Sequence, residues 1–195
     1  MRWLAYLAAA GVALLLAVMF AIALPDAAAR AREGWHRSAE SACETLLPAP
    51  DSPVLGVFPR PAPDFTLKDW AGHDVTLSSL RGTAVIVNFW ATWCPPCREE
   101  IASLEKLATN MKSKPFRLLA VSVDDDWPTV RKFFAKGTPL EVLLDTARAT
   151  PKLYGTEKFP ESFLVDKDGN IRYFVVSNRD WSTPEVQQCL ESLAD

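Results

Sequence analysis

The alternation of apolar and polar positions divides the chain into an apolar N-terminal run and a long region of short elements. Trp3 to Leu24 carries no charged residue, and its length suits a membrane-crossing helix, which needs roughly 20 apolar residues. A cleaved signal sequence is the alternative, because Ala27-Ala28-Ala29 offers small residues at which cleavage can occur. The apolar core of such a signal usually has only about 7–15 residues. We therefore predict an uncleaved membrane anchor over residues 1–24.

The next segment, residues 25–59, is predicted to be an Ala- and Pro-rich linker. Ala27 to Glu33 extends the helical pattern, and we expect Gly34 to interrupt it. Six of the fifteen prolines fall between Pro48 and Pro63, a density that favours an extended, semi-rigid spacer.

The pattern of residues 60–195 predicts one α/β domain. Alternation on both sides of Ala71-Gly72 indicates a β-hairpin over 64–80, and a second hairpin turn is predicted at Lys167 to Asn170. Nearly continuous apolar runs predict buried strands at 83–90, 117–123 and 140–145. Helical spacing predicts helices over 98–112, over 127–136 between an Asp126 cap and Gly137, and after Thr183-Pro184. Alternating strands and helices followed by a hairpin predict a mixed central sheet flanked by helices.

Composition and charge narrow the class of function. The chain is 49% hydrophobic, which suffices for a real core, and its net charge is -3. Acidic and basic residues are interspersed and form no basic patch, so we expect no nucleic-acid partner.

Two cysteines flank a Pro-Pro pair directly after the apolar run 83–90. Prolines are tolerated in the first turn of a helix, so we place Cys94 at the N-cap and Pro95 and Pro96 at the first helical positions. The N–H of Cys97 then points at the Cys94 sulfur, beside the positive end of the helix. Both effects favour the thiolate, which is the attacking species. Cys94 is predicted to be an exposed nucleophile and Cys97 the inward-facing resolving thiol.

Metal binding is disfavoured by the small number of ligands. A structural zinc site needs four. The remaining cysteines and the histidines are scattered: Cys43, Cys189, His36 and His73. Asp124 to Asp126 is interpreted as a strand-end loop that caps the next helix. We expect no metal and no cofactor, and a non-catalytic, tethered metal carrier is kept as an alternative.

Three segments, PDFTL, VNFWATWCPPCREE and KFPESFLVDKDGNI, resemble the thioredoxin-like superfamily, specifically its membrane-anchored TlpA/ResA-type thiol-disulfide oxidoreductases. The resemblance implies a thioredoxin-like fold with an N-terminal β-hairpin and a central insertion. It implies a domain on the periplasmic side of a bacterial cell membrane, attached by a single membrane-spanning helix. The expected substrates are disulfide-bearing exported proteins, for example in cytochrome c or copper-site maturation, and the expected reductant is an upstream thiol donor in the membrane.

The resemblance also assigns roles to residues. Cys94 and Cys97 are the redox pair, and Phe159-Pro160 matches the cis-proline step that lies opposite the cysteines and pairs with substrate. Trp93 and Pro95 are expected on the substrate-binding surface. Ordinary thioredoxin has a buried aspartate where this chain has Asn88, which cannot accept a proton. Its proton route is therefore not expected here.

Glu100 matches the acidic residue of the TlpA/ResA branch and lies three residues after Cys97, on the neighbouring helix turn. The stripe formed by Cys97, Ile101 and Leu104 should face the sheet, with Glu100 at its edge. A partly desolvated carboxylate there has a raised pKa and can take the proton of Cys97 as a general base. The alternative is a solvated glutamate near a helix start.

Two further points stay open at the level of sequence. An even cysteine count in an exported chain permits a Cys43–Cys189 disulfide, with two unpaired thiols as the alternative. DFTL also resembles the entry hairpin of peroxiredoxin-like thiol peroxidases, but their Pro-x-x-x-Thr-x-x-Cys spacing is missing, because Thr92 lies two residues before Cys94. We therefore predict a reductase of protein disulfides, with a thiol peroxidase as the alternative.

Overall fold

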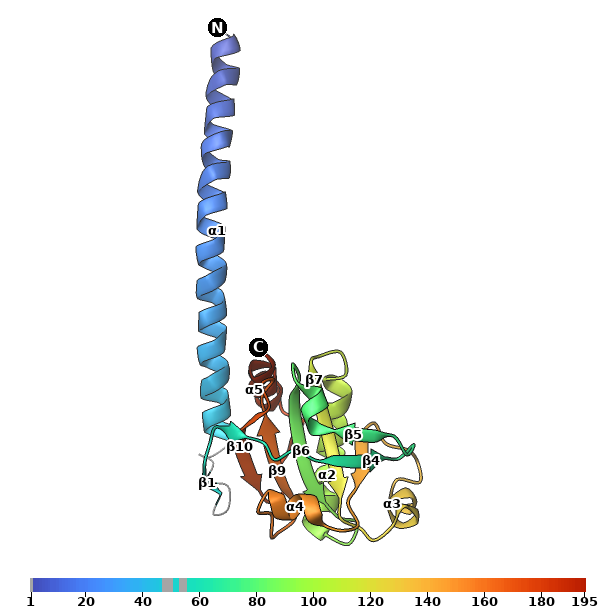
Figure 1. Cartoon of the computed structure of the whole chain (residues 1–195). Coiled ribbons are helices and arrows are strands. Elements are labelled where there is room, and N and C mark those ends of the chain that lie inside the picture. Colours follow the sequence, from blue (N-terminus) through green and yellow to red (C-terminus); the bar gives the residue numbers. More distant parts are fainter. Residues whose placement is uncertain (1, 47–50, 53–55) are drawn as a thin grey trace. The chain divides into compact units, whose positions relative to one another are not determined.

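The computed structural model describes residues 2–46, 51–52 and 56–195, and the chain forms two compact units, Met1–Ser38 and Ala39–Asp195. The first unit is part of one helix, α1 (Arg2–Leu46), shown in blue in Figure 1. Its segment Gly11–Trp35, which includes an 18-residue window with a mean hydropathy of 2.2, is by length and composition able to cross a membrane. This segment overlaps the predicted anchor and extends beyond it.

The prediction that Gly34 interrupts the helix is wrong. Helix α1 runs through Pro25 and Gly34 and ends at Leu46, so residues 25–46 of the predicted linker are helical. An isolated glycine costs a helix only about 1 kcal/mol relative to alanine, and strong helix formers precede it at Ala27 to Glu33.

The proline-rich part of the predicted linker falls partly outside the described residues, at 47–50 and 53–55. Two short strands, β1 (Asp51–Ser52) and β2 (Gly56–Val57), pair antiparallel within it. A third short strand, β3 (Arg60–Pro61), pairs with β10 at the edge of the main sheet. The predicted spacer therefore already pairs with the sheet at Arg60–Pro61. Pro61 is tolerated there because β3 is an edge strand.

The core of the second unit is an eight-stranded mixed sheet with the order β3-β10-β9-β6-β7-β8-β4-β5 (Figure 1). Its remaining strands are β4 (Thr66–Asp69), β5 (Asp74–Thr76), β6 (Ala84–Trp90), β7 (Phe116–Ser122), β8 (Glu141–Leu144), β9 (Glu161–Val165) and β10 (Asn170–Val176). Strand β6 is parallel to β7 and antiparallel to β9. The predicted hairpins are confirmed as β4–β5 and β9–β10.

The helices of this unit are η1 (Leu77–Leu80), α2 (Pro95–Asn110), α3 (Trp127–Phe133), α4 (Ala149–Leu153) and α5 (Pro184–Ala194). The predicted cap is confirmed, since the Asp126 side chain accepts a hydrogen bond from the backbone N–H of Thr129. Helix α3 ends before Lys136, and the chain then turns to Gly137 at a φ of +83°. Helix α4 was not predicted, because five residues are too few for a helical period to be recognised.

The central strand β6 is buried along its whole length and supplies both halves of the core. Ile86 and Trp90 belong to the cluster that includes residues of α2 and α5, whereas Val87 and Phe89 belong to the cluster of the opposite sheet face. Successive strand residues point to opposite faces, so Asn88 lies on the same face as Ile86 and Trp90. This places a polar side chain beneath α2.

A disulfide joins Cys43, near the end of α1, to Cys189 of α5 within the second unit. Their Cα atoms are 5.0 Å apart and both residues are 1% exposed. The bridge closes a loop with a sequence separation of 146 residues, which encloses nearly all of the domain.

Removing this bridge should lower stability. We expect the Cys43→Ala/Cys189→Ala chain to lose about 2–5 kcal/mol in its free energy of unfolding, because the unfolded state regains the entropy of the long loop. Denaturant titration of the full chain in detergent, under non-reducing conditions, measures the loss. Peptide mapping that found Cys43 and Cys189 as free thiols in the protein purified without reductant would contradict the assignment.

Candidate redox site

The redox motif lies where β6 passes into α2. Cys94 is the N-cap of α2 with Pro95 at its first position, and the Cys94 Sγ accepts a hydrogen bond of 3.3 Å from the backbone N–H of Cys97. The predicted cap geometry is confirmed. The two cysteines form a disulfide with their Cα atoms 5.3 Å apart.

The two sulfurs differ in exposure less than predicted. Cys94 is only 4% exposed and Cys97 is 0% exposed, so the prediction of an exposed Cys94 is wrong for this oxidised state. The reason is the loop that precedes β9. Its Phe159 carbonyl oxygen lies 3.5 Å from the Cys94 Sγ.

The same loop carries the Phe159–Pro160 peptide bond, which is cis, as the resemblance implied. Beside it, the Trp93 side chain is 57% exposed, and its ring centroid lies 6.1 Å from that of Phe159 in an edge-on contact. Pro95 is also exposed. The exposed Trp93 side chain and the half-buried Phe159 therefore lie beside the disulfide, whereas Pro160 is buried.

Glu100 is buried more deeply than the predicted edge position. It is 2% exposed, and both carboxylate oxygens accept hydrogen bonds from N–H groups. Asn88 Nδ2 donates to Oε1 at 2.8 Å from β6, and Trp181 Nε1 donates to Oε2 at 3.1 Å from the segment before α5. The alternative of a solvated helix glutamate is therefore wrong, because the sheet and Trp181 cover this face of α2.

Burial raises the pKa of Glu100 from 4.5 to about 6, although hydrogen bonds from Trp181, Asn88 and the backbone of Arg179 oppose the rise. Loss of hydration disfavours the ionised carboxylate more than these donors restore it. A carboxyl group with such a pKa exchanges its proton close to neutral pH.

The sequence interpretation did not find the partners of Glu100. Asn88 was recognised only as a departure from thioredoxin, yet its Nδ2 bridges Glu100 and the Ser162 hydroxyl, at 2.8 and 2.9 Å. The sequence signal that could have identified Asn88 was its amide side chain within the otherwise apolar run of β6. Trp181, fully buried, gave none, because it lies in an irregular segment.

Glu161 is a second buried carboxyl group that the sequence interpretation missed. It follows Pro160 directly and is 6% exposed, and burial raises its pKa to about 7. It pairs in register with Phe89, whereas Ser162 pairs with Asn88, so alternation along β9 places Glu161 on the sheet face opposite Glu100.

Asp124 is not part of the cap formed by Asp126. It is 1% exposed, and its carboxylate accepts hydrogen bonds from the Thr92 N–H at 3.0 Å and the Thr92 hydroxyl at 2.8 Å. The Ser122 hydroxyl donates to it at 2.7 Å. Asp124 therefore ties the loop that precedes Cys94 to the end of β7.

We expect Asp124→Ala to destabilise the fold by about 1–3 kcal/mol, because buried donors on Thr92 and Ser122 lose their acceptor. The neighbouring Asp125→Ala is the matched control. The Asp125 side chain is 89% exposed and pairs with Arg148 at the surface, so its loss should cost less than about 1 kcal/mol. Thermal unfolding of both variants measures the difference, and equal effects would contradict the assignment.

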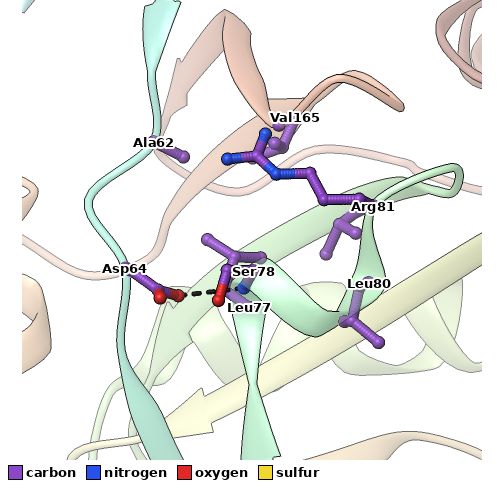
Figure 2. A pocket seen from close by; sticks show the side chains of 9 residues that line it. Ala62, Asp64, Leu77, Ser78, Leu80, Arg81 and Val165 are labelled. Carbon is purple, nitrogen blue, oxygen red and sulfur yellow. Dashed lines mark hydrogen bonds between the residues drawn. The ribbon is translucent and has the colours of Figure 1, made fainter.

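A pocket near the start of β6 lies away from this chemistry. Figure 2 shows it beside η1 and the segment that precedes β4, where the Asp64 carboxylate accepts a hydrogen bond of 2.9 Å from the Ser78 N–H. Its lining includes Arg81 and Val165 but neither Cys94 nor Cys97. The pocket therefore lies between packed segments of the fold and is not part of the redox site.

Comparisons with known proteins agree with this geometry. A family model described as the AhpC/TSA family matches residues 59–174. Thiol-disulfide oxidoreductase ResA of Geobacillus kaustophilus is 32% identical over 133 residues, which cover 68% of this chain and 75% of the relative. ResA of Bacillus subtilis is 34% identical over 111 residues, 56% of this chain and 62% of the relative. A crystal structure of a protein from Chlorobium tepidum, named as a thiol:disulfide interchange protein DsbE, matches with a TM-score of 0.62 and 36% identity, covering 69% of this chain and 96% of that one.

Proposed function

Because this chain belongs to the AhpC/TSA family and is a thiol-disulfide oxidoreductase of thioredoxin-like fold, we propose that it reduces disulfides of exported proteins through Cys94 and Cys97. The observation that carries the proposal is the position of the Cys94 sulfur. It lies at the N-terminus of α2 and 3.5 Å from the Phe159 carbonyl oxygen of the cis-proline loop. A substrate sulfur that reaches Cys94 thus meets a backbone segment able to hold its chain.

The reaction begins with the reduced enzyme. The Cys94 thiolate attacks one sulfur of the substrate disulfide, a mixed disulfide forms, and the other substrate sulfur leaves as a thiolate that takes a proton. The hydrogen bond from the Cys97 N–H and the positive helix end favour the attacking thiolate. Cys97 then loses its proton and attacks the Cys94 sulfur. The second substrate sulfur leaves and is protonated, so the substrate gains two electrons and two protons and the enzyme disulfide forms.

Glu100 is proposed to accept the proton of Cys97 in the second step. Cys97 is 0% exposed in the oxidised state, so water has little access to its sulfur. Glu100 lies one helix turn away on α2 with a pKa of about 6, so near neutral pH it is able to accept a proton.

Trp93, Pro95, Phe159 and Pro160 are proposed to form the substrate-binding surface. The exposed indole of Trp93 offers apolar contact beside the disulfide, and the backbone next to Pro160 offers hydrogen bonds to an extended substrate strand. The resemblance of this chain to TlpA/ResA-type proteins is the ground for proposing cytochrome c or copper-site maturation proteins as substrates.

The helix segment Gly11–Trp35, whose uncharged part runs to Pro25, is proposed to anchor the domain on the periplasmic side of a bacterial membrane. An upstream thiol donor in that membrane would regenerate the dithiol of Cys94 and Cys97, since each catalytic cycle leaves the enzyme oxidised.

The test is the reduction potential of the Cys94–Cys97 pair, measured by equilibration with glutathione. The Pro-Pro pair adds no charge that stabilises a thiolate further, so we expect a potential nearer about −270 mV than about −120 mV. A potential near the latter value would contradict the reducing role. A parallel assay of hydrogen peroxide consumption tests the peroxidase alternative, and we expect peroxide reduction to be slow beside reduction of a protein disulfide.

A further inference from the structure

The hydrogen bonds around Glu100 suit only one of its two protonation states. Both oxygens accept from N–H groups, which is the arrangement that an ionised carboxylate requires. A protonated carboxyl group also has an O–H that needs an acceptor. The Trp181 indole can only donate, so the O–H cannot face Trp181 and has to face Asn88.

Asn88 has the acceptor that the protonated state needs, at the other end of its amide. Its Nδ2 serves both neighbours, Glu100 Oε1 at 2.8 Å and Ser162 Oγ at 2.9 Å. Its Oδ1 is buried and has no hydrogen-bond partner within the described part of the chain. One end of this buried amide thus makes two hydrogen bonds and the other end makes none. A half rotation of the amide exchanges Nδ2 and Oδ1 and leaves the shape of the side chain unchanged.

We propose that Asn88 is a proton-coupled amide switch, whose side-chain amide turns by half a rotation when Glu100 takes up a proton. Its Oδ1 then faces Glu100 and Ser162 in place of Nδ2. The two ends of an amide have nearly the same size, so the turn requires no repacking of β6. The Ser162 hydroxyl follows the turn, because a hydroxyl both donates and accepts.

The switch keeps Glu100 hydrogen-bonded in both protonation states. With Glu100 ionised, Nδ2 donates to it, and with Glu100 protonated, its O–H donates to Oδ1. An aspartate at position 88 lacks this property, because its ionised form has no donor and would repel an ionised Glu100. Among the titratable residues of the surrounding segments, Cys97 precedes Glu100 by three residues on α2 and Arg179 reaches Glu100 through its backbone N–H. Arg98 and Glu99 of α2 and Asp180 before α5 are exposed to solvent, and Glu161 of β9 lies on the opposite sheet face. The inference deepens the proposed function, in which Cys97 supplies the proton, and makes Asn88 a positioning residue.

The test uses NMR on the full, oxidised chain in detergent, so that turnover plays no part. Nuclear Overhauser contacts from the Asn88 side-chain NH₂ to the Ser162 Hβ protons should be present at about pH 8 and lost at about pH 5, on either side of the pKa of about 6. Their loss should follow the titration of the Glu100 carboxyl carbon. Contacts that persist while that carbon titrates would overturn the proposal.

Glu100→Gln provides the matched control, because it imitates the protonated carboxyl group. Trp181 Nε1 selects the glutamine oxygen, so the glutamine NH₂ faces Asn88 and requires its Oδ1. The Asn88–Ser162 contacts should be absent at both pH values in this variant, and their presence would overturn the switch. A switch seen by NMR, combined with unchanged turnover in Glu100→Gln, would instead contradict only the proposed role of Glu100 in catalysis.

Discussion

Cys94→Ser should abolish reduction of protein disulfides, with a loss of at least about 10³-fold in turnover, because no other residue of the site supplies the attacking thiolate. Cys97→Ser should behave differently. Its Cys94 thiolate still attacks substrate, but nothing resolves the mixed disulfide, so covalent complexes with substrate accumulate. Non-reducing electrophoresis and mass spectrometry of the trapped species measure both outcomes.

The matched control is the Cys43→Ala/Cys189→Ala chain, which retains the redox pair. It should turn over normally at temperatures where it is folded, because Cys43 and Cys189 lie at α1 and α5 rather than at the start of α2. Mixed disulfides trapped by Cys94→Ser but not by Cys97→Ser would reverse the assigned roles and refute the argument from the helix N-terminus.

Glu100→Gln should slow resolution of the mixed disulfide by about 10²-fold or more, which is the range of general acid–base catalysis. The variant cannot accept the proton of Cys97, yet it keeps the size of the side chain in its buried site. The rise of the resolution rate with pH that follows a pKa of about 6 in the native chain should disappear. Stopped-flow fluorescence across about pH 5–9 measures the profile.

Glu99→Gln is the control for this measurement. Glu99 is exposed and accepts a hydrogen bond of 2.9 Å from Asn178 Nδ2, so its substitution changes the local charge without touching the buried network. Its pH profile should match that of the native chain. Equal profiles for Glu100→Gln, Glu99→Gln and the native chain would show that Glu100 takes no part in proton transfer.

The raised pKa of Glu100 also predicts the direction in which the free energy of unfolding changes with pH. Glu100 binds its proton more tightly in the folded chain, with a pKa of about 6 against 4.5 when solvated. Between these values the folded state holds more protons than the unfolded state, so the free energy of unfolding falls as pH rises through this window. The total change is about 2 kcal/mol. Glu100→Gln should remove this contribution, and urea titrations at several pH values measure it.

The sequence by itself determined the local elements and the position of the Cys94–Cys97 pair at a strand-to-helix turn. Continuous apolar runs gave the buried strands, and turn signals gave both hairpins, because these patterns depend on neighbours along the chain. The cap at Cys94 was also local, since two prolines fit only the first turn of a helix. The local rule that a glycine interrupts a helix failed at Gly34. Helix α1 continues through this residue, because the intrinsic cost of one glycine is smaller than the helix preference of its neighbours.

Only the tertiary structure decided how the site is enclosed. The low exposure of Cys94 arises from Phe159, which is 65 residues away along the chain. The depth of Glu100 depends on Trp181 and Asn88, at separations of 81 and 12 residues, so its periodicity on α2 predicted the correct helix face but not its burial. Desolvation and hydrogen bonding act through space, and the pKa of Glu100 and the two arrangements open to Asn88 follow from contacts that no local pattern records.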